Sequence, residues 1–569
     1  MSKWKDAHHK KDGSELSESE LAKRVEERER QVAEDIRQKA ARRQRKKVWS
    51  KSRSTVIAKA IETKAKVGGN ALAFIDPADG KKITFKEMIR GAFALGNALS
   101  RRTKRGENVG VLLPTSPGAI ITILALHVDG RVPAMLNFTA GKNALEAALE
   151  TAQVKTVLSS RKFVDVGGYQ DLIDFLSTKV EIVYLEDIKE NLSVFDKMRA
   201  LLGEKFPALA RRSLSPDSPA VVLFTSGTEG KPKGVVLSHQ NLVANVFQVI
   251  DHVQLEPREV FINPLPVFHS YGLTAGALFP MFAGHPSVPY PSPLHIKIVP
   301  EVVREYEATI MLATDTFLSR YLQNAKDGAL VSLRYAVCGA EKVRDETRRL
   351  ARNRFGFCVL EGYGATECAP VIAVNQPGDI RPGTVGKLLP GIETRIEPVE
   401  GLDEGGRLYV RGPNVMLGYI DPDAPESLLK PQDGWHDTGD IVHIDGGGYM
   451  SIKGRQKRFA KIGGEMVSLA VVENCASAVW PDNLNAAIIV PDPRKGEQII
   501  LLTEEPHPRP EHLRDWARSH GVPEIAMPKQ VLHVDDIPVL GTGKVDYVSL
   551  NRQAEELIAQ AEAQKTAAE

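Results

Sequence analysis

The chain is poor in cysteine and has no long apolar run. Four cysteines among 569 residues, none in a CxxC spacing, are too few for a disulfide framework, so we expect a reducing compartment and structural thiols. The longest apolar run, Ala119 to Leu126, is broken by His127 and Asp129 and is too short to span a bilayer. The basic N-terminus has no apolar segment after it, so it does not resemble a secretory signal. These absences predict a cytoplasmic protein, either soluble or peripheral at the inner face of the cell membrane.

Several common signatures of nucleotide-binding and hydrolytic enzymes are also missing. No Gly-Lys pair is followed by Ser or Thr, which excludes a Walker loop. No GxGxxG fingerprint follows an expected strand, and the chain has no GxSxG elbow. The absence of these three signatures therefore excludes P-loop enzymes, dinucleotide-binding enzymes and α/β-hydrolases.

The charge of the chain is unevenly distributed. Residues 1–55 carry 17 Lys or Arg and 10 Asp or Glu, although the whole chain has a net charge of only +2. Residues 37–53 contain nine basic side chains and no acidic one. We expect a solvated helix or a disordered arm over residues 1–55, with adhesion of residues 37–53 to an anionic membrane or an acidic partner as the alternatives. Nucleic acid is not an expected partner, because only Trp49 lies near the basic run for base stacking.

Beyond residue 55 the sequence alternates between helical and strand patterns. Apolar residues have helical spacing over residues 85–99, and residues 142–153 also predict a helix. Strands are expected at residues 108–113, 309–313, 334–339 and 357–362. This alternation predicts an α/β fold with mixed, mostly parallel sheets. A length of 569 residues further predicts two or three domains.

One loop carries the first functional signal. The string LFTSGTEGKPKGVVLSHQN, residues 223–241, follows an apolar run that reads as a buried strand. Glycine lets the backbone approach a phosphate closely, hydroxyls add donors, and lysine adds compensating charge. The residues expected to hold the phosphates are Thr225, Ser226, Gly227, Thr228, Gly230 and Lys233.

Five further strings occur in a fixed order after this loop. They are CGAEK at 338–342, LEGYGATECAPV at 360–371, GWHDTGDIVHID at 434–445, IKGRQKRFAKIGGEMVSL at 452–469 and GTGKVDY at 541–547. Together with the loop they resemble the signature segments of the adenylate-forming superfamily, which includes acyl-CoA synthetases, luciferases and peptide-synthetase adenylation domains. The resemblance implies a large N-terminal adenylate-forming domain, residues 56–454, and a small mobile α+β lid domain, residues 455–569.

The resemblance also implies a role for each matched residue. Asp440 would accept hydrogen bonds from the ribose hydroxyls, and Arg455 would contact the ribose or phosphate. Thr366 and Glu367 would reach the phosphates of ATP and Mg²⁺, with Glu367 as the metal ligand. The adenine would lie against Gly339, Ala340, Glu341, Gly362, Tyr363 and Gly364.

The C-terminal strings imply a rotating lid. Lys457 would occupy the hinge, and Gly463 and Gly464 would line the thiol channel. Lys544 would offset the negative charge that develops when a carboxylate attacks the α-phosphate. The implied reaction has two steps: a carboxylate and ATP give an acyl-adenylate and pyrophosphate, and a thiol then displaces AMP to form a thioester.

The segment PLPVFHSYGLTAG, residues 264–276, indicates the type of acid. It is apolar and aromatic, resembles the pocket entrance of fatty acyl ligases, and lacks the acidic residue that amino-acid-activating domains use. His269 would gate the pocket beside the acyl carboxylate, although a buried structural histidine is the alternative.

Other strings, such as RVPAMLNFTAG, YPSPLHIKIVPE and HGVPEIA, resemble the acyl-[acyl-carrier-protein] synthetase half of bacterial bifunctional acyltransferases. The leading hypothesis is therefore a fatty acid ligase that uses acyl carrier protein as the thiol acceptor, and CoA is the alternative acceptor. A hypothesis of another class is a non-catalytic nucleotide-binding scaffold at the membrane. The presence of Lys233, Glu367, Asp440 and Lys544 argues against a scaffold.

Overall fold

The structure is a computed structural model, and its described part divides into two compact units. It describes residues 17–42, 53–211, 213–225, 232–256, 259–400, 402, 404–462, 465–492, 496–539, 545–547 and 549–557. The large unit comprises Met1–Glu393 and Arg411–His436, and the small unit comprises Thr394–Val410 and Asp437–Glu569. The domain borders expected after residues 55 and 454 remain predictions.

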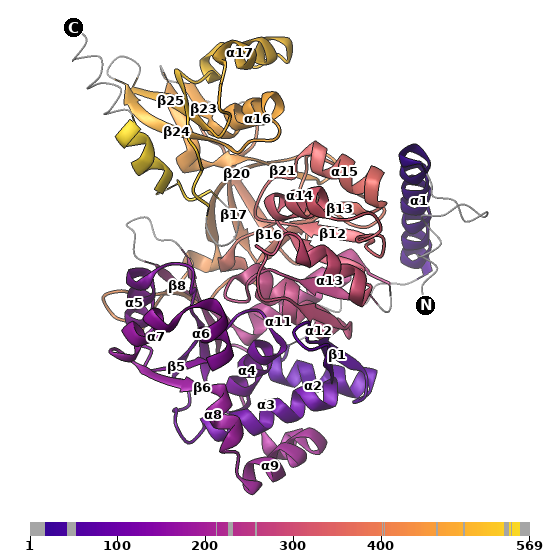
Figure 1. The fold of residues 1–569 in the computed structure, drawn as a ribbon, viewed down its shortest axis with the longest axis vertical. Coiled ribbons are helices and arrows are strands. Elements are labelled where there is room, and N and C mark those ends of the chain that lie inside the picture. Colours follow the sequence, from indigo (N-terminus) through magenta and orange to yellow (C-terminus); the bar gives the residue numbers. More distant parts are fainter. Residues whose placement is uncertain are drawn as a thin grey trace. The chain divides into compact units, whose positions relative to one another are not determined.

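The first sheet of the large unit has nine strands, with a parallel centre and antiparallel edges (Figure 1). Its order is β15-β14-β13-β12-β11-β9-β10-β1-β2. Neighbours from β13 to β1 run parallel, whereas β14, β15 and β2 pair in the antiparallel sense. The strands are β1 Leu72–Ile75, β2 Lys82–Thr84, β9 Phe261–Asn263, β10 Ser287–Pro289, β11 Ile310–Ala313, β12 Tyr335–Cys338, β13 Cys358–Gly364, β14 Val371–Val374 and β15 Lys387–Leu388.

The second sheet of the large unit has eight strands in the order β19-β18-β8-β7-β4-β3-β5-β6. In β7, Val221 and Leu223 pack into one apolar core, while Val222 packs into another on the opposite face. Because both faces are buried, the strand appears in the sequence as an unbroken apolar run. The strands are β3 Asn108–Val111, β4 Val132–Met135, β5 Thr156–Ser159, β6 Glu181–Tyr184, β7 Pro219–Thr225, β8 Lys233–Ser238, β18 Gly418–Ile420 and β19 Leu428–Leu429.

Helices cover both large sheets. One core joins residues of both sheets to α3, α4 and α11, and a second lies between the eight-stranded sheet and α5 to α7. The helices are α1 Glu18–Arg42, α2 Val56–Val67, α3 Phe85–Leu99, α4 Pro117–Val128, α5 Lys142–Thr151, α6 Arg161–Gly167, α7 Gln170–Ser177, α8 Leu185–Glu190, α9 Val194–Lys205, α10 Pro207–Ala210, α11 His239–Val253, α12 Phe279–Ala283, α13 Ile298–Tyr306, α14 Asp315–Asn324 and α15 Asp345–Phe355. Single turns and irregular helices are η3 Tyr271–Leu278, η4 Thr366–Cys368 and η5 Gln432–Gly434.

Among its described residues the small unit contains two sheets, the helices α16 and α17, and further helical residues at 549–557. One sheet has the order β16-β17-β20-β21, and the other has the order β23-β22-β25-β24 with β26 parallel to β25. Its elements are β16 Glu393–Glu397, β17 Gly406–Arg411, β20 His436–Ile444, β21 Met450–Arg455, η6 Gln456–Arg458, β22 Phe459–Ile462, β23 Glu465–Ser468, α16 Leu469–Val479, β24 Asn485–Asp492, β25 Gly496–Thr503, α17 Pro510–Ser519, η7 Glu524–Ala526 and β26 Gln530–His533.

The N-terminal helix α1 lies within the region where a solvated helix or a disordered arm was expected. Residues 18–42 form a helix, but it is docked rather than solvated, because Leu21 and Val25 are buried against the rest of the large unit. Glu29 accepts a hydrogen bond from the Tyr335 hydroxyl at 2.9 Å and from the Gly378 amide at 2.8 Å. The thin apolar stripe of α1 and these polar contacts are therefore sufficient to dock the helix. The basic residues 37–53 lie largely outside the described part of the chain.

The fold class is confirmed. The expected helices at residues 85–99 and 142–153 correspond to α3 and α5, and the four expected strands correspond to β3, β11, β12 and β13. A capping box fixes the start of α3, because Thr84 and Glu87 bond reciprocally to each other's backbone amides. None of the helices in the described ranges combines the length and apolar character that a bilayer span requires.

Candidate active site

The two strands that flank the predicted phosphate loop in the sequence are paired. Strands β7 and β8 pair in the antiparallel sense, with Thr225 opposite Lys233. Thr225 is half-buried and Lys233 is exposed. The loop between them, with Ser226, Gly227, Thr228 and Gly230, lies outside the described residues. The strand before the loop is the buried strand that the sequence predicts.

A tyrosine connects Lys233 to the predicted metal ligand. The Lys233 ammonium lies 5.1 Å from the centroid of the Tyr419 ring, at a distance typical of a cation–π contact. The Tyr419 hydroxyl donates a hydrogen bond of 2.7 Å to Oε1 of Glu367. Tyr419 lies on β18, which pairs with β8. Sequence reasoning missed this residue, because a lone tyrosine in a three-residue strand carries no functional signal.

The turn that carries Thr366 and Glu367 is fixed at several points. The Met416 amide donates to the Glu367 carbonyl at 2.8 Å, and the Asn414 side chain donates to the Cys368 carbonyl at 2.7 Å. The hydroxyls of Thr366 and Ser270 are hydrogen-bonded at 3.2 Å. Since Ser270 follows His269, this contact brings the predicted gating segment beside the predicted phosphate and metal segment.

The segment after His269 packs closely against the nine-stranded sheet. His269 is half-buried and precedes the π-helix η3, which is almost entirely apolar and buried. A side chain at Gly272 would come within 2.2 Å of the Pro266 carbonyl, so only glycine fits there. The Tyr271 hydroxyl donates to the Val337 carbonyl at 2.8 Å, and burial holds the Tyr271 pKa well above its usual value. The gating segment is therefore attached to β12, the strand that leads to the predicted adenine loop.

The predicted adenine residues lie after two neighbouring parallel strands. β12 leads to Gly339, and β13 ends with Gly362 to Gly364. A side chain at Gly339 would come within 3.3 Å of the Tyr271 ring and 3.7 Å of the Gly362 carbonyl. This close approach brings the two strings together, as the rule for ligand sites at the carboxyl ends of parallel strands predicts.

Three residues of these strings have particular environments. Ala340 has a φ of 73°, a left-handed conformation that is uncommon outside glycine. The Glu341 carboxylate is engaged at the start of α14, where it accepts from the Thr316 amide at 3.0 Å and hydroxyl at 2.8 Å. Tyr363 is half-buried on β13. Glu341 therefore has a structural task in addition to any contact with a base.

Cys338, at the end of β12, is a structural thiol as expected. It is fully buried, and burial together with the neighbouring Asp315 and Glu361 holds its pKa well above the usual value. A thiol with a raised pKa is protonated and unreactive at neutral pH. None of the four cysteines forms a disulfide.

The small unit holds the predicted ribose and hinge residues. Asp440 on β20 lies directly opposite Arg455 on β21, and the Arg455 Nε lies 3.2 Å from Oδ1 of Asp440. Asp440 is buried and Arg455 is exposed. The two residues, 15 positions apart, are therefore a direct cross-strand pair. Lys457 is exposed on η6, whereas Gly463, Gly464 and Lys544 lie outside the described residues.

The residues present suit a magnesium ion that arrives with nucleotide. Mg²⁺ keeps several waters and is usually held by one or two carboxylates plus substrate phosphates. Glu367 offers one such carboxylate, and Tyr419 fixes its orientation. No cluster of three or more His, Cys, Asp or Glu side chains suitable for a metal occurs among the described residues. A single oriented carboxylate is consistent with this type of site.

Comparison with known proteins decides the family. The model of the AMP-binding enzyme family matches residues 61–420. The chain belongs to the AMP-binding enzyme family. The matched region contains the β7–β8 hairpin, His269, the strings after β12 and β13, and Tyr419.

Relatives of this AMP-binding enzyme include several CoA ligases. A long-chain-fatty-acid–CoA ligase of Bacillus subtilis (strain 168) is 26% identical over 505 residues, which cover 82% of this chain and 89% of the relative. A feruloyl-CoA synthase of an Amycolatopsis species is 27% identical over 485 residues, covering 82% of this chain and 93% of the relative. The prediction of an AMP-forming acid–thiol ligase is confirmed at the level of the family.

Solved structures agree with the fold and the cofactors. ATP-bound MatB from Rhodopseudomonas palustris superposes with a TM-score of 0.74 at 26% identity, covering 87% of this chain and 99% of MatB. MenE from Bacillus subtilis, in complex with ATP and magnesium, shares the fold with a TM-score of 0.72 at 21% identity, covering 86% of this chain and 98% of MenE. ATP, one of the two predicted cofactors, is confirmed for the family.

Proposed function

We propose that this AMP-binding enzyme activates a fatty acid with ATP and transfers the acyl group to the thiol of CoA. One arrangement supports the proposal best: the turn of Thr366 and Glu367 is bonded to Ser270 on one side and to Tyr419, beneath Lys233, on the other. Residues expected to touch the phosphates, the metal and the acyl carboxylate thereby converge within the large unit.

Each step follows from the charges of the reactants. In the first step a carboxylate oxygen bonds to the α-phosphorus of ATP and pyrophosphate leaves. Lys233 and Lys544 offset the negative charge that opposes this attack, and His269 orients the carboxylate. Glu367 would hold Mg²⁺, which would supply positive charge to the phosphate oxygens. In the second step the thiol sulfur bonds to the acyl carbonyl carbon, its proton is lost, and AMP leaves.

The remaining site residues bind the nucleotide in this proposal. Gly339 to Glu341 and Gly362 to Gly364 surround the adenine, with Tyr363 against its face. Asp440 accepts from the ribose hydroxyls, while Arg455 holds that carboxylate in place and contacts the ribose or phosphate. Lys457 serves as the hinge of a mobile lid, and Gly463 and Gly464 admit the thiol.

The acceptor is the part of the proposal that changes most from the sequence hypothesis. The relatives named above are CoA ligases, which favours CoA over acyl carrier protein. The strings that resemble acyl-carrier-protein synthetases keep the carrier protein as the second candidate. Both acceptors present the same phosphopantetheine thiol, and residues 37–53 could attract either an acidic carrier protein or an anionic membrane surface.

Thioester formation tests the proposal directly. The purified full chain is incubated with ATP, Mg²⁺ and fatty acids of different lengths, and thioester is measured with CoA and with holo-acyl carrier protein. We expect acyl-CoA, AMP and pyrophosphate in equal amounts. If thioester forms only with the carrier protein, the carrier protein and not CoA is the acceptor. Absence of fatty-acid-dependent ATP–pyrophosphate exchange would instead favour a nucleotide-binding scaffold.

The contact between Tyr419 and Glu367 gives a sharper test of the site. Tyr419→Phe removes the hydroxyl donor but keeps the ring beneath Lys233, so we expect kcat to fall about tenfold, as for the loss of one hydrogen bond to a charged group. The Mg²⁺ concentration for half-maximal activity should rise as well. Tyr409→Phe, on β17, is the matched control. An unchanged Mg²⁺ dependence in Tyr419→Phe would contradict the assignment of Glu367 as metal ligand.

A further inference from the structure

Helix α9 is oriented with its two carboxylates toward the protein and its large apolar side chains toward solvent. Its inward stripe consists of Asp196, Ala200, Gly203 and Glu204, all buried. These positions are four, three and one residues apart, so they form one helical face. Amphipathic helices of globular proteins normally bury their apolar face instead. The orientation of α9 therefore requires an explanation.

Polar contacts with α3 fix the N-terminal half of α9. Arg101 donates to both carboxylate oxygens of Asp196, at 2.6 and 2.8 Å, and Asn97 also donates to Asp196. These contacts, together with the hydroxyl of Ser193, hold the pKa of Asp196 well below its usual value, with Arg101 as the largest cause. A charged residue with three partners cannot turn outward without losing them.

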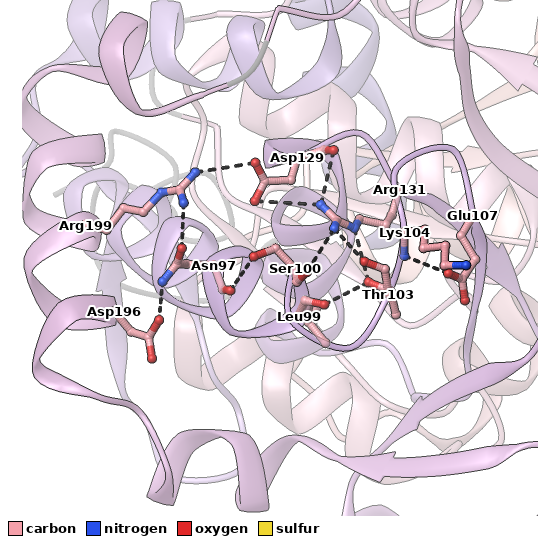
Figure 2. A network of polar contacts seen from close by, with 10 residues as sticks. All are labelled: Asn97, Leu99, Ser100, Thr103, Lys104, Glu107, Asp129, Arg131, Asp196 and Arg199. Atoms are coloured by element: carbon pink, nitrogen blue, oxygen red, sulfur yellow. Dashed lines mark hydrogen bonds and ion pairs between the residues drawn. The ribbon is translucent and has the colours of Figure 1, made fainter.

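The network extends from α9 to the end of α4. Figure 2 shows Arg199 of α9 reaching between Asn97 and Asp129. Arg199 donates to the Asn97 amide oxygen at 2.7 Å and to Asp129 at 3.5 Å. Asp129 in turn faces Arg131, which also donates to the Thr103 carbonyl at 2.7 Å. The rotation of α9 about its axis is therefore set by a buried network that spans several elements.

The C-terminal half of α9 is fixed equally well. Lys64 binds Glu204 through both its carboxylate and its carbonyl, and Arg90 pairs with the same carboxylate at 3.3 Å. At Gly203 a side chain would come within 2.4 Å of the buried Phe93 ring, so α9 and α3 are in close contact. The inward face is thus complementary to α3 along its whole length.

The outward face is apolar and basic. Its large apolar residues are between 44% and 75% exposed. The other exposed long side chains of α9 are Lys197 and Lys205. Its two carboxylates are buried and paired, and Arg199 is only 30% exposed and lies against Asp129. Figure 1 draws this helix at the bottom of the view, next to α3. The exposed apolar residues are Val194, Phe195, Met198, Leu201, Leu202 and Phe206.

We propose that this outward face of α9 docks on the surface of an anionic lipid bilayer. Helices that lie in the interface of a membrane combine Phe and Leu on one side with Lys or Arg at its margin. Apolar side chains of α9 would enter the boundary between headgroups and acyl chains, while Lys197 and Lys205 would meet lipid phosphates.

A bilayer fits this face better than a protein partner does. Protein interfaces carry about one hydrogen bond per 100–200 Å², yet the outward face offers no exposed carboxylate, amide or hydroxyl among the described residues of α9. A single helix also presents a convex face, whereas the anchoring residues of protein interfaces fill pockets. Flexible Met, Leu and Phe side chains need no specific partner geometry in lipid.

Vesicle binding tests the proposal with a closely matched pair of variants. In Val194→Gln/Leu202→Gln the exchanged residues are 75% and 53% exposed, and in the control Val166→Gln/Leu429→Gln they are 81% and 51% exposed. Co-sedimentation is measured with vesicles of phosphatidylglycerol and phosphatidylcholine, and with phosphatidylcholine alone. We expect wild type to prefer the anionic vesicles, the α9 variant to bind them about tenfold more weakly, and the control to bind within about twofold of wild type.

A second pair of variants tests the role of charge. Lys197→Gln/Lys205→Gln should weaken binding to anionic vesicles by about tenfold at low salt, since each basic residue near an anionic surface contributes up to about fivefold. Lys66→Gln/Lys162→Gln, at exposed positions elsewhere in the large unit, is the control. The difference between the two pairs should shrink as salt screens the lysines.

Three outcomes would overturn the proposal. If wild type does not bind anionic vesicles, an anionic bilayer is not the partner of this face. If the α9 variants bind like wild type, membrane contact belongs to another surface, such as residues 37–53. Self-association of wild type that Val194→Gln/Leu202→Gln abolishes would make this face an interface between copies of the chain. Thioester formation with a short, soluble acid should remain unchanged in every variant, so failure here is distinguishable from failure of the proposed ligase activity.

Discussion

Two highly charged helices of the large unit bury opposite kinds of side chain. Helix α1 buries Leu21 and Val25, and the charged side chains among its described residues 18–36 are exposed or half-buried. Helix α9 buries Asp196 and Glu204 and exposes its large apolar side chains. The two helices therefore dock through opposite kinds of side chain, although both carry many charges.

The difference lies in what each helix meets. The surface beneath α9 presents Arg101, Asn97 and Lys64, which are charged or polar partners that compensate buried carboxylates. The surface beneath α1 offers the Tyr335 hydroxyl and the Gly378 amide to Glu29. Its ion pair with a carboxylate of α1, Arg352 with Glu26, is partly exposed rather than buried. Helix orientation is thus decided by the polar partners in the receiving surface, because a buried charge without a partner costs more than an exposed apolar side chain.

Removal of the α9 carboxylate should break this arrangement with the largest effect. Asp196→Ala leaves the buried Asn97 and the paired Arg101 without their acceptor, so we expect the free energy of unfolding to fall by about 3 kcal/mol. Urea unfolding measures the loss. The control Asp187→Ala, in an exposed pair with Arg161, should cost less than about 1 kcal/mol. Equal losses in both variants would mean that burial does not strengthen the Asp196 contacts.

A charge in the apolar stripe of α1 should have a smaller, local effect. Val25→Asp buries an unpaired carboxylate, and undocking of α1 relieves it, so the cost is limited to the docking free energy, about 2 kcal/mol. Hydrogen exchange should become fast in α1, while the unfolding midpoint of the remaining chain stays constant. Lys23→Asp, at an exposed position, is the control and should leave exchange slow. Global destabilisation by Val25→Asp would show that α1 is part of the central cooperative unit.

Acid should weaken the contacts that Asp196 and Glu204 of α9 make with the rest of the large unit. The pKa values of Asp196 and Glu204 are lowered in the folded state, so their contribution to stability is present above their unfolded values of about 4 and is lost as the pH falls below them. Unfolding free energies measured from pH 6 to pH 3 should fall more steeply for wild type than for Asp196→Asn. Parallel curves would contradict the assignment of the lowered pKa to this network.

Deletion of residues 1–42 should have the smallest effect on catalysis. Helix α1 contacts Tyr335, Gly356 and Cys358, at the amino ends of β12 and β13, whereas the predicted adenine residues follow their carboxyl ends. We expect kcat/KM to remain within about threefold of the full chain, since no reacting group loses a contact. A much larger loss in steady-state assays would indicate coupling through these two strands.

The sequence predicted those parts of the site that depend on short strings. The unbroken apolar run before Thr225 indicated a buried strand, and strands were also expected at residues 334–339 and 357–362, which lead into the two predicted adenine strings. Both expectations rest on apolar patterns within short contiguous segments, and ligand sites commonly follow such strands in open α/β sheets.

Contacts between distant segments were not predictable in the same way. Tyr419 and Glu367 are 52 positions apart, and only the pairing of β18 with β8 brings the tyrosine beneath Lys233. Asp440 and Arg455 were identified separately, but only the register of β20 and β21 places them opposite each other. The sequence contains no local signal for either pairing.

The sequence by itself determined the alternation of helices and strands, the order of the signature strings and the family that they resemble, because each depends on residues close together in the chain. Only the tertiary structure decided which side of α9 faces solvent. Its sequence allows a helix in either orientation, and the choice depends on Arg101, Asn97 and Lys64, which reach α9 only after α2 and α3 have folded against it. Partners that are remote in the chain select the orientation of the helix, and thereby the surface that the protein presents.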